Sequence, residues 1–246
     1  MKKLLIVLLA ALPLYPALAE YQSTLLVQTG QFRESDLIVR TVSDLESNKI
    51  CLAFYIRTTG TSPAMYCYEW TAGFRTNINQ VGHFKEGKLV IRKIKDSINS
   101  MSCLVAYVST SGTSPAIDCY RSVVVPKDSI VRQGHLREGD LDVHRIVDPD
   151  SAETCLIAYV STNSTSPALI CYKNQAGGKG NMTQTNFMRE GDLIVRKIVD
   201  QPNGKECLIS YVSTQGTRSH IHCFDKYQPA QAQPANPLPP RYRTTP

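Results

Sequence analysis

Eight cysteines recur at a fixed spacing, and disulfide formation is the chemistry that this spacing favours. The two cysteines of each pair are 16 residues apart, and successive pairs are 52 residues apart. No pair has the C-x-x-C spacing common in metal sites, and a repeating unit with two cysteines can close its own bridge. We therefore predict four bridges within repeats: Cys51–Cys67, Cys103–Cys119, Cys155–Cys171 and Cys207–Cys223.

A second recurring set carries hydroxyl groups and aromatic rings that could contact a polar ligand. In each copy a tyrosine lies four residues after the first cysteine, and two threonines follow it. Two interpretations remain open: a glycan-type site presented four times, or side chains that each copy needs in order to fold. The set comprises Tyr55, Thr58, Thr61, Tyr107, Thr110, Thr113, Tyr159, Thr162, Thr165, Tyr211, Thr214 and Thr217.

Acidic and basic positions recur as well. An aspartate that we expect at a turn has the copies Asp44, Asp96, Asp148 and Asp200. A basic series has Arg40, Arg92 and Arg196, with His144 in place of arginine in the third copy. These charges either form a positive ring or decorate solvated strand faces.

The fourth copy departs from the others at one loop. Copies one to three read Thr-Ser-Pro-Ala, whereas the fourth reads Thr217-Arg218-Ser219-His220. His220 and His222 share one face of a strand, but two ligands do not complete a metal site, so we predict neither metal nor cofactor. The chain also has no nucleophile elbow, no H-E-x-x-H and no phosphate-binding glycine loop, which favours a protein that is not an enzyme.

The elements that position these residues are β-strands. The segments 36–42, 51–56 and 64–68 are rich in β-branched and aromatic residues, and turn residues such as Gly60 and Pro63 separate the last two. Glu34-Ser35 is predicted to be a two-residue hairpin turn, which implies a further strand near 27–32. If Cys51 faces Cys67, then Ala53 faces Met65.

Four copies of this unit predict an all-β fold of tandem repeats of about 52 residues, each an antiparallel meander stapled by a disulfide. The second strand is apolar on both faces, so its sheet should lie between two neighbours. A four-bladed propeller-like assembly satisfies this pattern, and two β-sandwiches or four beads on a string are the alternatives. The predicted repeats span 20–74, 75–126, 127–178 and 179–226.

Both ends of the chain differ from the repeats. Residues 1–19 combine two lysines, an apolar run and a small-x-small cleavage site, which is typical of an export signal. The apolar run is too short for a membrane span, and no later stretch is apolar enough for one, so we predict no transmembrane segment. Residues 227–246 contain six prolines and are predicted to be a disordered tail, either solvated or a docking peptide.

Composition limits the class of function. Removal of Lys2 and Lys3 leaves 25 basic and 21 acidic residues, a net charge of +4, and this scattered excess argues against nucleic-acid binding. We expect a periplasmic or secreted, non-catalytic binding or scaffold protein that engages an envelope protein partner, with the tail 227–246 as one route of contact. A lectin-like glycan binder and an enzyme with a site between repeats are the alternatives.

Overall fold

The computed structural model describes residues 26–58, 60–122, 130–161, 165–173, 180–213 and 218–226. These ranges form sixteen β-strands and one 3-10 turn, η1 (Gln201–Asn203). The strands are β1 (Leu26–Glu34), β2 (Leu37–Asp44), β3 (Lys49–Ile56), β4 (Ala64–Glu69), β5 (Ile78–Glu86), β6 (Leu89–Asp96), β7 (Met101–Val108), β8 (Ala116–Arg121), β9 (Val131–Glu138), β10 (Leu141–Asp148), β11 (Glu153–Val160), β12 (Ala168–Lys173), β13 (Met182–Glu190), β14 (Leu193–Asp200), β15 (Lys205–Val212) and β16 (His220–Asp225). Within the described ranges no helix is long and apolar enough to cross a bilayer.

The strands form four antiparallel sheets of four strands each, taken in chain order. We call them unit 1 (β1–β4), unit 2 (β5–β8), unit 3 (β9–β12) and unit 4 (β13–β16). Cys51 pairs with Cys67 and Ala53 with Met65, which confirms the predicted register. All four predicted disulfides are present.

One predicted turn is displaced by a residue. β1 continues through Glu34, which pairs with Leu37, so the two-residue turn is Ser35-Asp36 instead of Glu34-Ser35. Ser35 has a φ of 55°, and the other units place Gly87, Gly139 and Gly191 at the same left-handed position. Glycine suits that conformation because it has no Cβ to clash with the backbone. The second turn residue is Asp36, Lys88, Asp140 or Asp192.

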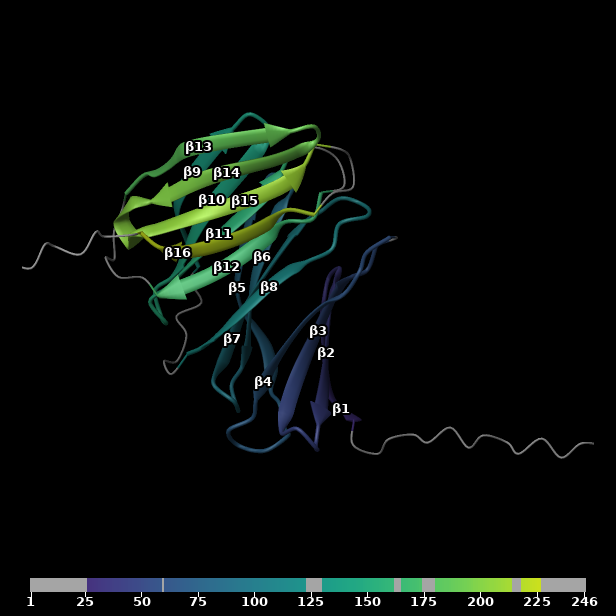
Figure 1. The fold of residues 1–246 in the computed structure, drawn as a ribbon. Helices are drawn as coiled ribbons and strands as arrows, with labels where there is room; N and C mark the ends of the chain where they lie inside the picture. Colours follow the sequence, from purple (N-terminus) through teal and green to yellow (C-terminus); the bar gives the residue numbers. More distant parts are fainter. Residues whose placement is uncertain are drawn as a thin grey trace, which may run out of the picture.

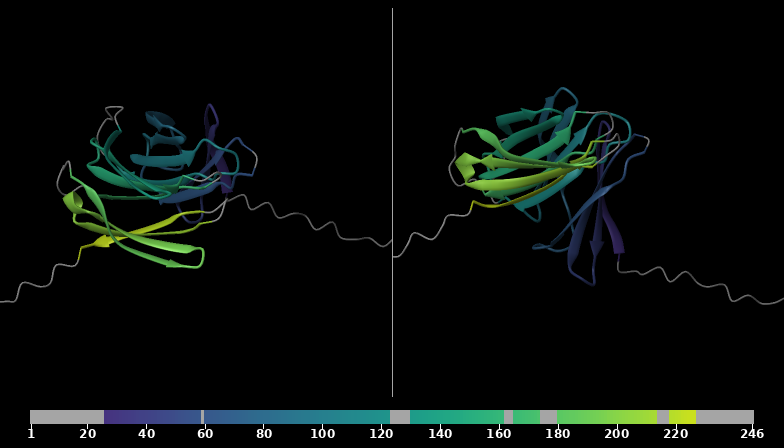
Figure 2. Two further views of the ribbon diagram at one scale, coloured as in Figure 1. Left: turned by 90° about the horizontal axis from the view of Figure 1, so that it is seen from above. Right: turned by 45° about the horizontal axis from the view of Figure 1, so that its top comes forward.

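The four units stack one after another in an open array. Figures 1 and 2 show the sheets following each other from the purple β1–β4 to the yellow-green β13–β16, each turned relative to the last. Contacts join β4 to β8, β8 to β12 and β12 to β16, but among the described residues no comparable contact returns from β16 to β4. The array is therefore neither a closed propeller ring, nor two separate sandwiches, nor isolated beads.

Three apolar cores hold the stack together, and each lies between two successive units. The first contains Leu37 and Phe54 of unit 1 with Val105 and Tyr107 of unit 2. The second joins units 2 and 3, and the third joins units 3 and 4. Every residue of β7 is buried, because alternate side chains enter the cores on its two sides. This confirms that the doubly apolar strand belongs to a sheet covered on both faces.

Buried polar contacts fix the position of each unit on the next. A tyrosine hydroxyl at the fourth strand donates to the recurring aspartate of the following unit: Tyr68 to Asp96 at 2.7 Å, Tyr120 to Asp148 at 2.7 Å and Tyr172 to Asp200 at 2.5 Å. Phe224 stands at the corresponding position of unit 4. These aspartates are not simply turn residues at the surface, because Asp96, Asp148 and Asp200 are buried at the junctions between units.

Two of the three junctions also contain a buried ion pair. Lys93 donates to Asp148, and Arg145 donates to Asp200 at 2.6 Å. A glycine in the first strand makes room for each cation, since a Cβ on Gly82 would lie 3.1 Å from Lys93 and one on Gly134 would lie 3.3 Å from Arg145. Thr41 takes the place of the cation in unit 1.

Candidate functional site

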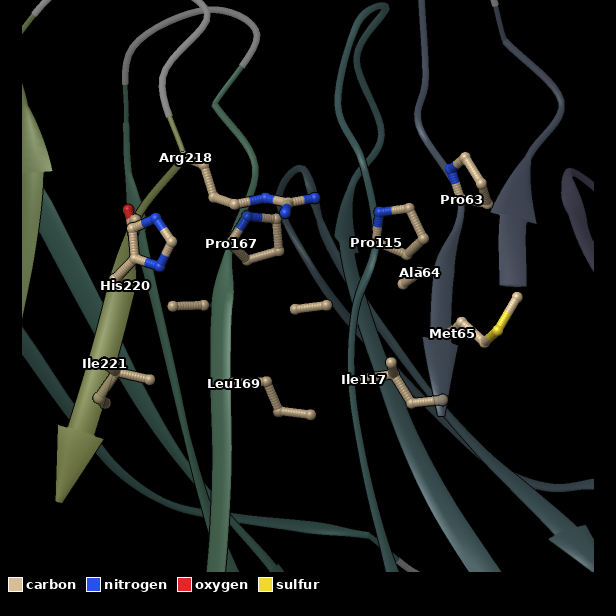
Figure 3. A pocket seen from close by; sticks show the side chains of 13 residues that line it. Pro63, Ala64, Met65, Pro115, Ile117, Pro167, Leu169, Arg218, His220 and Ile221 are labelled. Atoms are coloured by element: carbon tan, nitrogen blue, oxygen red, sulfur yellow. The ribbon is translucent and has the colours of Figure 1, made fainter. Parts of the chain in front are cut away.

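The beginnings of the four fourth strands lie side by side and line one shallow trough. Figure 3 shows β4, β8, β12 and β16 in chain order, with their side chains arranged in rows across the strands. The trough has a volume of about 370 Å³ and takes equivalent residues from all four units. The lining residues are Pro63, Ala64, Met65, Pro115, Ala116, Ile117, Pro167, Ala168, Leu169, Arg218, Ser219, His220 and Ile221.

Threonines hold the loops that lead into the trough. The hydroxyl of Thr61 donates to the carbonyl oxygens of Ile56 at 2.9 Å and Thr58 at 3.3 Å. Thr113 makes the same two bonds in unit 2, and Thr165 donates to the carbonyl of Val160 in unit 3. These hydroxyls satisfy backbone carbonyls where the third strand ends, so each loop leaves its sheet in the same way.

Serines then join one loop to the next. The backbone N–H of Ser62 donates to the Ser114 hydroxyl at 2.9 Å, and the N–H of Ser114 donates to the Ser166 hydroxyl at 2.9 Å. In unit 4, which has Arg218 at this position, the N–H of Ser219 donates to the Ser166 carbonyl at 3.2 Å. This ladder aligns the four loops, and the prolines that follow therefore form a row.

The trough combines small apolar side chains with a guanidinium from unit 4. Pro115, Ala116 and Pro167 form the middle, and Met65 is 61% exposed at the unit 1 end. His220 lies at the unit 4 end, and the side chain of Arg218 extends from unit 4 across Pro167 towards Pro115 in the view of Figure 3. Each fourth strand is the last of its sheet, and the fourth strands of successive units contact each other. An extended chain that crosses these strands would meet a similar patch of each unit in turn.

The recurring tyrosines lie away from the trough, at the junctions between units. The Tyr107 hydroxyl donates to Asp36 of unit 1 at 2.9 Å and accepts from Arg92 at 3.0 Å. Tyr211 repeats this arrangement with Asp140 and Arg196. The pKa of both phenols is raised to about 12, mainly by burial; the aspartate partners also raise it, whereas Arg92 and Arg196 lower it. These hydroxyls are therefore engaged within the chain.

The other tyrosines and threonines of the recurring set do not share one environment. The guanidinium of Arg40 lies 5.9 Å from the ring centre of Tyr55, and Tyr159 lies near His144. Thr58 contributes its carbonyl to Thr61, and the hydroxyl of Thr110 is buried with no partner among the described residues. Thr162, Thr214 and Thr217 lie outside the described residues, as do the segments 1–19 and 227–246.

The two histidines of the fourth unit lie on β16, and both are exposed. His220 contributes to the trough. Among the described residues no group of three or more His, Cys, Asp or Glu side chains is arranged to hold a metal ion. The other histidine cluster, His135 and His144, lies at the junction of units 2 and 3, with ring centres 4.6 Å apart.

The sequence analysis missed the trough, although its signal was present. The Ser-Pro-Ala motif was interpreted only as turn chemistry, yet its recurrence at the start of each edge strand places three prolines in one row once the sheets stack. In sequence, no protein-family model and no curated protein matches this chain.

Proposed function

We propose that this protein is a non-catalytic binding protein that holds an extended segment of a protein partner in the trough. The observation that carries the proposal is that equivalent residues of all four units line one continuous surface. Stacked repeats commonly present such surfaces to elongated partners, because each repeat supplies one similar patch. The partner segment would cross the four edge strands and contact each unit in turn.

The chemistry of the trough suggests the kind of segment. Pro, Ala and short aliphatic side chains leave shallow spaces that suit small apolar residues. Arg218 of unit 4 favours an acidic residue beside its guanidinium, because a guanidinium pairs well with a carboxylate. We therefore expect a segment that is largely apolar and carries one acidic residue beside Arg218.

We propose that the protein is located in an oxidising compartment, either the bacterial periplasm or the extracellular space. Four disulfides support this setting, since such bridges persist in exported proteins and are rare in reducing cytosol. Residues 1–19 have the composition of an export signal. Fractionation of the producing cells, followed by detection of the mature N-terminus, tests this part.

A display library of twelve-residue peptides, selected on the full mature chain, tests the binding function. Selected peptides should be largely apolar with an acidic residue, and they should lose at least about tenfold in affinity to Met65→Lys and to Arg218→Glu. Met188→Lys is the matched control, because Met188 is 50% exposed on unit 4 and lies outside the trough. Peptides that bind all three variants as they bind the native protein would refute the proposed site.

The glycan-binding and enzymatic alternatives have no comparable support. The hydroxyls of Thr61, Thr113 and Thr165 are used by backbone carbonyls, and those of Tyr107 and Tyr211 by aspartates. A glycan array tests the first alternative and a substrate screen on the same preparation tests the second. A hit in either assay that is equally strong with Met65→Lys would favour that alternative.

A further inference from the structure

A second cavity lies at the junction of units 2 and 3, and it shares no residue with the trough. It has a volume of about 240 Å³. The turn of unit 2 that contains Lys88 forms one side, and His135, Asp142, His144 and Tyr159 of unit 3 form the other.

The other two junctions show what normally fills this place. Between units 1 and 2, the carboxylate of Asp36 accepts from the Tyr107 hydroxyl and lies 3.4 Å from the guanidinium of Arg92. Between units 3 and 4, Asp140 accepts from the Tyr211 hydroxyl at 2.7 Å, and the Arg196 guanidinium lies 3.6 Å away. Each of these junctions therefore encloses an aspartate, a tyrosine and an arginine in contact.

The junction of units 2 and 3 has lost two members of this group. Lys88 stands where the other turns have aspartate, and His144 stands where the other sheets have arginine. The shorter imidazole leaves space that a guanidinium would occupy. Tyr159 is retained, but its hydroxyl makes no hydrogen bond among the described residues.

His144 is the most unusual side chain of the cavity. It is only 2% exposed, yet neither ring nitrogen has a hydrogen-bond partner among the described residues. Its ring stacks between those of His135 and Tyr159. A buried imidazole without partners is costly unless something supplies the missing hydrogen bond.

The acidic groups nearby already have basic side chains as partners. Glu86 is paired with Arg132, and Asp142 lies 3.0 Å from the Nε2 atom of His135 and 3.9 Å from Arg137. Lys88, in contrast, is exposed and forms no ion pair among the described residues. The groups without a hydrogen-bond partner among the described residues are thus the Lys88 ammonium, the Tyr159 hydroxyl and the His144 imidazole, whose Nδ1 atom lies 3.8 Å from a carboxylate oxygen of Glu86.

We propose that this cavity binds the carboxylate group of a small ligand in the place that Asp36 and Asp140 occupy at the other two junctions. The carboxylate accepts a hydrogen bond from the Tyr159 hydroxyl and another from an N–H of His144, and the Lys88 ammonium balances its charge. The ligand supplies the acceptor that the Asp-to-Lys replacement removed.

Two sources can provide this group, a free organic acid or the C-terminus of a peptide, and the experiment separates them. The full mature chain is titrated with acetate, succinate and D-glucuronate, and with tri-alanine that carries a free C-terminal carboxylate. Acetamide, succinamide and C-terminally amidated tri-alanine are the neutral controls. Binding is followed through the NMR signals of the His144 ring. The buffer contains no carboxylate.

At least one carboxylate should shift the His144 signals, and its neutral amide should not. A free acid that does so identifies small organic acids as the ligand, and tri-alanine alone identifies a peptide terminus. Tyr159→Phe should weaken binding about tenfold, because a hydrogen bond to a charged group is lost. Lys88→Asp combined with His144→Arg rebuilds the group found at the other junctions and should abolish binding, read from the Tyr159 ring signals, while the fold is kept.

Three results would overturn the proposal: no carboxylate perturbs His144, the amides bind as well as the acids, or Tyr159→Phe binds with unchanged affinity. Since Tyr159→Phe removes a single oxygen atom, it tests the site even if the double variant does not fold. Failure here leaves the trough untouched, because the two sites share no residue.

Discussion

The Nζ atom of Lys93 lies 2.7 Å from a carboxylate oxygen of Asp148 in the next unit, and neither side chain is exposed to solvent. The same ammonium lies 3.1 Å from Asp150. Burial by itself would raise the pKa of Asp148, but hydrogen bonds from Lys93, Tyr120 and Ser151 outweigh it and lower the pKa. One lysine of unit 2 is therefore tied to two carboxylates of unit 3.

Replacement of Lys93 by methionine should destabilise the protein by about 3–5 kcal/mol, because the change leaves buried Asp148 without its cation. Urea denaturation of the native and variant chains measures the difference. The double variant Lys93→Met with Asp148→Asn should recover much of the loss. Equal stability of the native protein and Lys93→Met would contradict this account.

The tyrosine hydroxyls at the junctions should contribute less to the free energy of unfolding than Lys93 does, but the contribution should be measurable. Tyr120→Phe removes the donor 2.7 Å from Asp148 and should cost about 1–3 kcal/mol, because a buried acceptor loses a hydrogen bond. Tyr66→Phe is the control, since Tyr66 is only partly buried and makes no such bond among the described residues. The two variants should differ clearly in their urea midpoints; matching midpoints would mean that the hydroxyl of Tyr120 does not stabilise the stack.

Stability should also depend on pH through His144. Burial, aided by His135, lowers the pKa of His144 to about 4 from 6.5, although Glu86 and Asp142 act in the opposite direction. Between these values the unfolded chain binds a proton that the folded chain does not, so stability is full above pH 6.5 and falls as the pH drops towards 4. The loss should reach about 3 kcal/mol.

Urea denaturation between pH 4 and pH 7.5, in buffers free of carboxylates, checks this expectation. His144→Gln should flatten the pH dependence, because glutamine does not titrate. A variant whose stability follows the native pH curve would show that another group is responsible.

The disulfides should differ in their effect according to their position in the stack. Cys155 is fully buried in the core between units 2 and 3, whereas Cys67 is exposed in unit 1. Replacement of Cys155 and Cys171 by alanine should cost about 3 kcal/mol from loss of the cross-link, and somewhat more from the cavity. Cys51→Ala with Cys67→Ala should cost less. Thermal unfolding of both variants gives the comparison, and the reverse order would contradict it.

The sequence predicted much of each unit, because four copies of one pattern reinforce each other. Segments rich in β-branched and aromatic residues, separated by turn residues, placed the strands, and the shared spacing of the cysteines set the register of Cys51 with Cys67. The predicted turn was displaced by one residue because β1 extends to Glu34, and strand ends depend on the last backbone hydrogen bonds. The sequence pattern therefore predicted the strands and their register better than the residues at which each strand begins and ends.

Contacts between units were beyond what the sequence pattern could predict. Lys93 and Asp148 are 55 residues apart, and they meet only because one sheet is offset and turned relative to the next. That offset depends on the cores and on the serine ladder of Ser62, Ser114 and Ser166. The same rotation decides whether the sheets close into a ring. The burial of β7 on both faces therefore indicated that the sheets stack, but it did not show whether the stack closes.

Phe224 has a consequence for how many such sheets one stack can hold. Tyr68, Tyr120 and Tyr172 each offer a proton to an aspartate of the following sheet, and Phe224 offers none. A further sheet of the same type would have to bury its aspartate against the ring of Phe224, which has no hydroxyl to donate a hydrogen bond. Unit 4 therefore lacks the hydroxyl that joins each of the first three units to the next, and Phe224→Tyr is the change that would restore it.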